Sequence, residues 1–144
     1  MTKSDDAAAG FREGFSSSQA VVSSFSEDLG LDKETARKIS CGFGAGMART
    51  GNICGAVTGA MMVIGLKYGK AMANDDAAKE RTYALVQEFI TKFRVKNGSI
   101  NCTDILGYDL CDPEQRKQAH ESGVVATKCP EFARDAAVIL EKIL

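Results

Sequence analysis

The chain has 144 residues, of which 44% are hydrophobic and 26% are charged. This is the size and composition of one ordinary globular domain, residues 1–144, and it excludes long disordered stretches. Eighteen basic and nineteen acidic residues give a net charge of -1 with the two signs interspersed, which excludes the basic surface that nucleic-acid binding requires. A chain of this length buries about 68–70% of its unfolded surface, so the fold does not need its cysteines as cross-links.

The N-terminal segment predicts a cytoplasmic protein. It is polar, from Met1 to Asp6, and lacks the apolar stretch of a secretory signal. The longest apolar run, residues 53–66, contains three glycines and is shorter than the ~20 residues that span a bilayer, so we expect a buried helix and no membrane span. Because the cytoplasm keeps thiols reduced, catalytic, redox-sensing or metal-binding roles are favoured for the cysteines.

Helical spacing of apolar residues dominates the first half of the chain. It predicts one amphipathic helix from about Asp5 to Leu29, ended by Gly30, and a shorter helix that follows an Asp32 cap. The alternating glycines of residues 41–47 predict a flexible connection with positive-φ positions, and residues 49–52 predict a turn. A glycine-rich helix is expected from about Cys54 to Met72.

The second half continues the same pattern. Asp75 or Asp76 can cap a long helix that Asn97-Gly98 ends, and a short helix is expected from about Cys102 to Leu106. Asp112-Pro113 predicts another helix start, and Pro130 predicts the start of the last helix. No run alternates as a strand does. The expected fold is therefore all-α: a single compact helical bundle of about five to seven helices with a glycine-rich central helix.

Glycine and histidine patterns exclude several kinds of site. Glycines at positions 55, 59, 65 and 69 predict a close crossing with another helix, or a groove for a ligand. Gly42, Gly44 and Gly46 lack the spacing and the preceding strand of a phosphate-binding loop. His120 is the single histidine, which excludes zinc hydrolases with several imidazoles, and we expect it to be solvated. The haem attachment motif Cys-x-x-Cys-His is absent.

Four of the five cysteines lie at predicted helix starts: Cys54, Cys102, Cys111 and Cys129. The unpaired N–H groups and the dipole at such a start stabilise a thiolate and lower the pKa of the thiol, which makes it a nucleophile or a metal ligand. The alternative is that they are packing residues, since free cysteine is often buried. No Cys-x-x-Cys is present, so neither a thioredoxin motif nor a zinc ribbon is indicated.

The segment Cys54-Gly55-Ala56-Val57-Thr58-Gly59 resembles the Cys-Gly-Ala-x-x-Gly signature of the redox-active proteins called the C_GCAxxG_C_C family. The resemblance spans nearly the whole chain. It also includes Gly14-Phe15 with Gln19-Ala20-Val21, the residues 42–47, Cys102 with Leu106-Gly107, and Cys129-Pro130. It implies a small helical domain with redox or metal chemistry. Such proteins are often encoded near transporters, and some are fused to haem-bearing segments, which this chain lacks.

The family has four characteristic cysteines, and three of them match Cys54, Cys102 and Cys129. Ser17 occupies the position that matches the first cysteine. A hydroxyl cannot form a disulfide and is a poor ligand for a soft metal. Either that cysteine is dispensable, or Cys41 or Cys111 replaces it, or this form is impaired.

Three hypotheses follow. In the first, the chain is a thiol-based redox protein with oxidoreductase-type activity toward an unknown redox partner protein, Cys54 being the low-pKa nucleophile and Cys102 or Cys129 the resolving thiol. In the second, these three cysteines hold an iron–sulfur cluster or another metal, with Cys41, Cys111 or an exogenous ligand completing the shell. In the third, the chain is a structural or partner-binding bundle whose glycine groove receives another helix or forms a homodimer. The candidate cofactor-binding residues are Gly55, Ala56 and Gly59.

Overall fold

A computed structural model describes residues 2–144, and within them the fold is all-helical, as predicted. The helices are α1 (Lys3–Arg12), α2 (Ser17–Ser26), α3 (Lys33–Ser40), α4 (Gly44–Ala48), α5 (Gly55–Tyr68), α6 (Asp76–Asn97), α7 (Cys102–Leu106), α8 (Pro113–Glu121) and α9 (Val124–Ile143), with 3-10 turns η1 (Glu27–Leu29) and η2 (Cys41–Phe43). Residues 2–144 contain no β-strand. One isolated antiparallel bridge joins Ile53 to Asn101.

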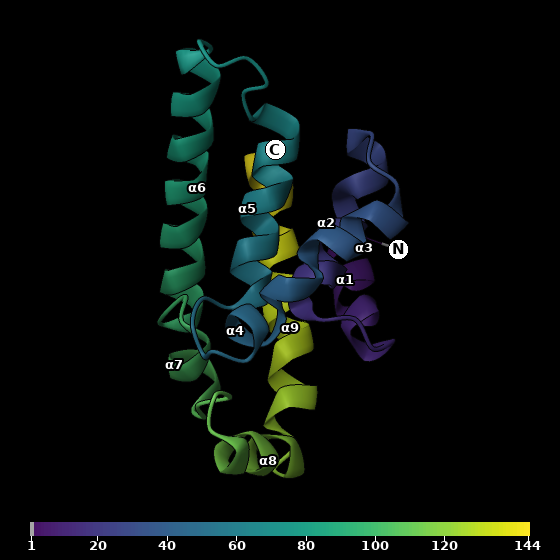
Figure 1. Ribbon diagram of the computed structural model, residues 1–144, viewed down its shortest axis with the longest axis vertical. Coiled ribbons are helices and arrows are strands. Elements are labelled where there is room, and N and C mark those ends of the chain that lie inside the picture. Colours follow the sequence, from purple (N-terminus) through teal and green to yellow (C-terminus); the bar gives the residue numbers. More distant parts are fainter. Residues whose placement is uncertain (1) are drawn as a thin grey trace.

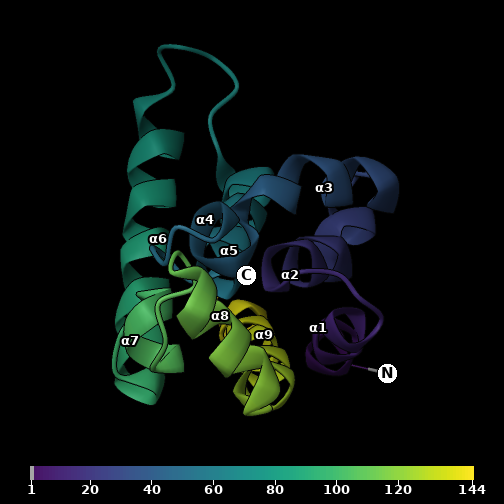
Figure 2. The same cartoon turned by 60° about the horizontal axis from the view of Figure 1, so that its bottom comes forward.

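The glycine-rich helix α5 is central. It packs against α2, α6 and α9, and the three long helices α5, α6 and α9 run side by side along the length of the molecule (Figure 1). Helices α1, α2 and α3 cover one side, while α7 and α8 close one end (Figure 2). The core between α5, α6 and α9 contains Phe89 and Phe93, whose ring centroids lie 5.9 Å apart. No described helix is long and apolar enough to cross a membrane.

The predicted first helix is two helices. Gly14 has a φ of +114°, which ends α1, and a capping box then starts α2. In this box the Ser16 hydroxyl accepts a hydrogen bond from the Gln19 amide, and the Gln19 side-chain oxygen accepts one from the Ser16 amide at 3.0 Å. The Ser-x-x-Gln signature was visible in the sequence, but the apolar period continues across the break and concealed it.

The predicted close helix crossing is present at two of the four glycines. A Cβ added at Gly55 would lie 3.0 Å from the Ser18 amide nitrogen, and one at Gly59 would lie 3.0 Å from the Ser18 carbonyl oxygen. Helix α2 therefore packs directly on the backbone of α5. Gly65 faces open space, and Gly69 follows the helix, which ends at Tyr68 rather than Met72.

The prediction that Pro130 starts the last helix was wrong. Helix α9 begins at Val124 and continues through Pro130, which is buried. A proline inside a helix removes one hydrogen bond and costs about 3 kcal/mol. Packing of Val124 and Val125 against the core offsets this cost. Cys129 consequently lies inside a helix and not at its start.

Candidate functional site

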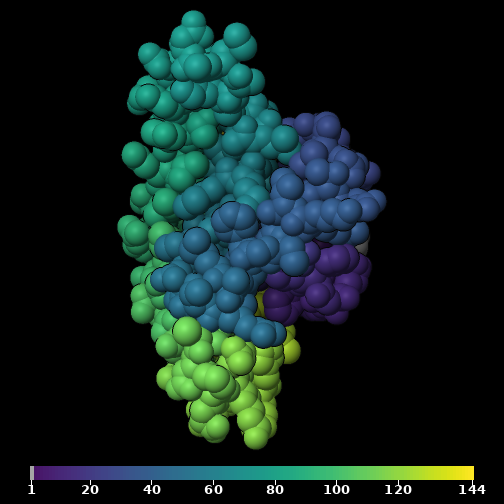
Figure 3. Space-filling model, in the orientation of Figure 1, coloured from purple at the N-terminus to yellow at the C-terminus, as the bar shows by residue number. Residues whose placement is uncertain are grey.

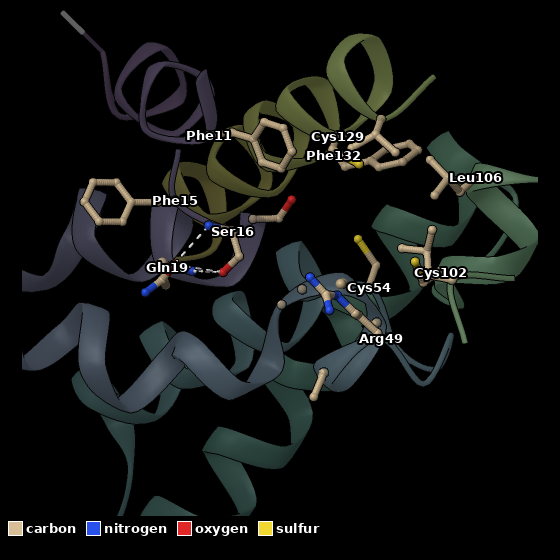
Figure 4. A pocket seen from close by; sticks show the side chains of 18 of the residues that line it. Phe11, Phe15, Ser16, Gln19, Arg49, Cys54, Cys102, Leu106, Cys129 and Phe132 are labelled. Carbon is tan, nitrogen blue, oxygen red and sulfur yellow. Dashed lines mark hydrogen bonds between the residues drawn. The ribbon is translucent and has the colours of Figure 1, made fainter. Parts of the chain in front are cut away.

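A cavity of about 790 Å³ lies where α2, α4, α5, α7, α8 and α9 meet. Four of its lining residues are the sites singled out from the sequence, namely Ser17, Cys54, Cys102 and Cys129. Figure 4 shows the three cysteine side chains arriving from different elements. In the space-filling view, the segment that contains α4 lies between the N-terminal helices and α8 (Figure 3). We call this space the cysteine cavity.

Cys54 and Cys102 are held together by the isolated bridge. The Cys54 amide donates to the Ile100 carbonyl at 2.8 Å, and the Cys102 amide donates to the Asn52 carbonyl at 2.6 Å. Each cysteine follows a residue of the Ile53–Asn101 pair, so their side chains leave the same face of this short ribbon. Diagonal neighbours of this kind have Cα atoms about 7–8 Å apart, so a disulfide between them, which needs Cα atoms within about 7 Å, requires a small movement of the backbone.

The two cysteines also begin helices, as predicted. Cys54 is the N-cap residue of α5, and Cys102 is the first residue of α7, after the capping residue Asn101. Both side chains are buried, with 5% and 8% of their surface exposed. The backbone next to Cys102 is tightly packed, because a Cβ added at Gly46 would lie only 2.7 Å from the Cys102 Cβ.

Cys129 reaches the cysteine cavity from the middle of α9 and is half-buried. Charge on Cys54 or Cys102 would raise the pKa of the Cys129 thiol, which shows that the three sulfurs are electrostatic neighbours. All five cysteines are free thiols in the described chain.

The prediction of a low-pKa thiol was wrong. The amides of Ala56 and Val57 face the Cys54 sulfur and lower its pKa, as the helix-start argument expects, but burial outweighs them and raises the pKa of Cys54 to about 12. Burial likewise raises the pKa of Cys102 to about 11 and that of Cys129 to about 12. All three thiols are therefore protonated at neutral pH.

Ser17, the residue at the family's first cysteine position, is the first residue of α2 and is 7% exposed. It lines the cysteine cavity together with the three cysteines. Of the two cysteines considered as replacements, Cys41 is exposed on η2 and lines the cavity, whereas Cys111 is exposed and does not. The structure thus favours Cys41 over Cys111 as a fourth thiol.

The metal-binding alternative stays a prediction. Within residues 2–144, no three His, Cys, Asp or Glu side chains gather closely enough to hold a metal ion. The three thiols share a cavity without forming a ligand set in this conformation. Of the candidate cofactor-binding residues, Gly55 lines the cavity, while Ala56 and Gly59 lie in the core; their role in binding a cofactor stays a prediction.

Sequence reasoning missed two polar residues of the cavity wall. His120, near the end of α8, is exposed as expected but also lines the cavity. Arg49 lines the cavity as well (Figure 4). It ends a run of residues 45–49 that all have positive φ, so the positive-φ positions expected around these glycines are present and α4 is a left-handed turn. Only the glycine pattern of residues 42–46 pointed to unusual backbone there.

Comparison with known proteins gives one match. A family model described as "Putative redox-active protein (C_GCAxxG_C_C)" matches residues 15–143, which is nearly the whole chain. No curated protein and no solved structure matches the chain.

Proposed function

The chain belongs to the C_GCAxxG_C_C family of redox-active proteins, and we propose that it acts by thiol–disulfide exchange through Cys54, with Cys102 or Cys129 as the resolving thiol. One observation carries the proposal: three cysteines that are far apart in the sequence line a single cavity, and Ser17, at the family's first cysteine position, lines it too. Packing cysteines have no reason to converge in this way.

Cys54 is the best candidate for the attacking thiol. Two backbone amides face its sulfur, whereas no such group lowers the pKa of Cys102 or Cys129. The thiolate is the nucleophile in exchange reactions, and amides that favour it also favour the transition state in which charge develops on sulfur. Because burial keeps the thiol protonated, we expect reaction to be slow until a substrate disulfide enters the cavity.

The proposed reaction reduces a substrate disulfide and forms one disulfide in the protein. Cys54 attacks one sulfur of a substrate disulfide, forms a mixed disulfide, and its proton goes to the departing substrate thiolate. Cys102 or Cys129 then attacks the Cys54 sulfur, and its proton goes to the second substrate thiolate. The protein dithiol becomes a disulfide, and the substrate disulfide becomes two thiols. A reducing cytoplasm would return the protein to its dithiol state.

Mass spectrometry tests this proposal. After treatment with one equivalent of an organic disulfide, peptide mapping should find a disulfide between Cys54 and Cys102 or Cys129. Cys54→Ser should abolish this linkage, while Cys111→Ser, which changes an exposed cysteine outside the cavity, should leave it intact. Cys54 found only as a free thiol after such treatment would overturn the proposal.

Ser17→Cys sharpens the test by restoring the family pattern. The new thiol would lie in the cysteine cavity with Cys54, Cys102 and Cys129, and also with Cys41. In a Cys41→Ser background, we therefore expect the variant to release four electrons on full oxidation where the same background without Ser17→Cys releases two. Ser24→Cys, on the same helix but outside the cavity, is the matched control and should add no second intramolecular disulfide.

The same variant examines the alternative of a cysteine-bound cluster. Iron–sulfur clusters normally take four thiolate ligands. If the family chemistry is a cluster, anaerobic reconstitution of Ser17→Cys with iron and sulfide should give visible absorption and bound iron that the parent chain lacks. Colourless protein with intact disulfide formation would leave thiol exchange as the function.

A further inference from the structure

The cysteine cavity is lined by basic side chains and not by acidic ones. Its lining includes Arg49 and His120 and contains no aspartate or glutamate. One carboxylate outside the lining, that of Asp109, raises the pKa of Cys102 and accepts a hydrogen bond from the Cys111 amide at 2.9 Å. The cavity wall thus presents a guanidinium without a counter-ion.

Arg49 has no partner in the described chain. Its side chain makes no ion pair and no hydrogen bond among residues 2–144. Most other arginines are engaged: Arg134 pairs with Asp5, Arg37 stacks on Phe15, and Arg81 stacks on Tyr68. An unpaired guanidinium beside a cavity is poised to bind an anion, since it presents a planar array of donors that matches a carboxylate.

The backbone holds Arg49 there at a cost. Every non-glycine residue with positive φ in residues 2–144 belongs to one turn: Ala45, Met47, Ala48 and Arg49. The left-handed conformation costs about 1–2 kcal/mol for each such residue. The Thr50 hydroxyl and the Asn52 amide secure the turn by donating to the Gly46 carbonyl at 2.8 and 2.9 Å. Strain of this kind is typical of ligand clamps.

Most of the remaining cavity wall is apolar, with Ser16, Ser17 and Gln19 as its polar residues. Aromatic and aliphatic side chains form the apolar part, among them Phe11, Leu106 and Phe132 (Figure 4). A volume of about 790 Å³ lies within the range of about 300–1,000 Å³ that small-molecule sites have. The cavity is therefore suited to a molecule with an apolar body and one acidic group.

We propose that the cysteine cavity binds a small organic anion, whose acidic group pairs with Arg49 and whose apolar part lies against Phe11 and Phe132 beside the thiols. The proposal deepens the proposed function and rests on it in one respect: the bound molecule is the disulfide that Cys54 attacks. Its class is then an apolar disulfide that carries a carboxylate or another acidic group, reduced to two thiols while the protein dithiol is oxidised.

A redox-inert probe tests the binding site apart from the chemistry. The anionic dye 8-anilinonaphthalene-1-sulfonate and its neutral analogue N-phenyl-1-naphthylamine have the same apolar body and fluoresce in apolar sites. We expect Arg49→Gln to weaken binding of the sulfonate about tenfold and to leave the neutral probe unchanged, because charge-assisted hydrogen bonds are the strong ones. Arg49→Lys should retain part of the preference.

Three controls make the result specific. Arg94→Gln changes an exposed arginine that lies outside the cavity and should alter neither probe. Ala126→Trp places a bulky side chain at an exposed position of the cavity wall and should weaken both probes. Cys54→Ser should still bind the sulfonate, so loss of thiol chemistry leaves this test intact. Equal binding of the sulfonate by Arg49→Gln and the parent chain would overturn the proposal.

Reaction rates then test the substrate class. The dicarboxylate 5,5′-dithiobis(2-nitrobenzoate) and the neutral 4,4′-dithiodipyridine are both aromatic disulfides. Relative to a small free thiol, Cys54 in the parent chain should favour the dicarboxylate by about tenfold, and Arg49→Gln should abolish that preference. A preference that survives Arg49→Gln would contradict the role of Arg49. Failure of both disulfides to react while the sulfonate still binds would overturn thiol exchange and leave the anion site standing.

Discussion

Two regions of this molecule differ in how closely their side chains pack. Between α5, α6 and α9 the side chains are fully buried and in contact, as with Ile64, Phe89, Phe93 and Leu140. Around the cysteine cavity the chain keeps an open volume, buried thiols and a left-handed turn. Each of these costs stability, and together they occur only at the site of proposed function. The stability that packing gives the first region offsets the cost of the open volume, buried thiols and left-handed turn in the second.

The largest expected effect comes from the packed region. Phe89→Ala should lower the free energy of unfolding by about 3–5 kcal/mol, because it removes a fully buried ring that stacks on Phe93. Denaturant unfolding measures this loss. In folded Phe89→Ala, Cys54 should still form its disulfide. A small loss of stability together with a loss of disulfide formation would reverse the division between the regions.

Two glycines on α5 test the close contact between α5 and α2, which joins the packed region to the cavity region. Gly59→Ala should destabilise the fold by about 1–3 kcal/mol, because its Cβ would press on the backbone of Ser18 and displace the helix that carries Ser17. Gly65→Ala is the matched control. It faces open space in the same helix, so it should be neutral or should stabilise the fold by up to about 1 kcal/mol. Similar stability of both variants would contradict the close crossing.

Alkaline pH should lower the stability of the fold through the thiols of the cavity region. The thiols of Cys54, Cys102 and Cys129 keep protons that the unfolded chain releases above its ordinary thiol pKa of 9.0, because burial raises their pKa values to about 11–12. The folded state then binds more protons than the unfolded state, so stability is fully present below pH 9 and falls as the pH rises toward 12.

Urea unfolding under reducing conditions measures this slope. Cys54→Ala should flatten the decline, and Cys111→Ser, which changes an exposed thiol, should leave it as it is. Unfolding that is independent of pH from 8 to 10.5 would show that the thiols are not buried as described.

The smallest effect is a gain. Arg49→Gly should stabilise the fold by about 0.5–1 kcal/mol, because glycine tolerates the φ of 68° at this position better than arginine does. The same change should remove the preference for anionic ligands. Thermal unfolding and sulfonate titration of one preparation measure both. Loss of stability in Arg49→Gly would show that the left-handed turn is not strained.

Much of the fold was predictable from local pattern. The 3.6-residue period and the caps at Asp32, Asp75 and Asp112 predicted most helices, because these signals act between residues near in sequence. The two errors have different causes. The spacing of apolar residues continues past Gly14, so the break between α1 and α2 was not predicted. Pro130 looked like a helix start because the packing that lets α9 continue through it involves distant residues.

The sequence by itself determined the all-α class, the central glycine-rich helix and the cysteines that matter, because periodicity, capping and motif spacing are written within short stretches of chain. Only the tertiary structure decided the protonation state of those cysteines and which residues surround them. Burial, which depends on every neighbour, reversed the expected pKa of Cys54, and the folding of distant segments brought Ser17, Cys102, Cys129 and Arg49 around one cavity. Burial and convergence are properties of the whole packed chain, and no local pattern encodes them.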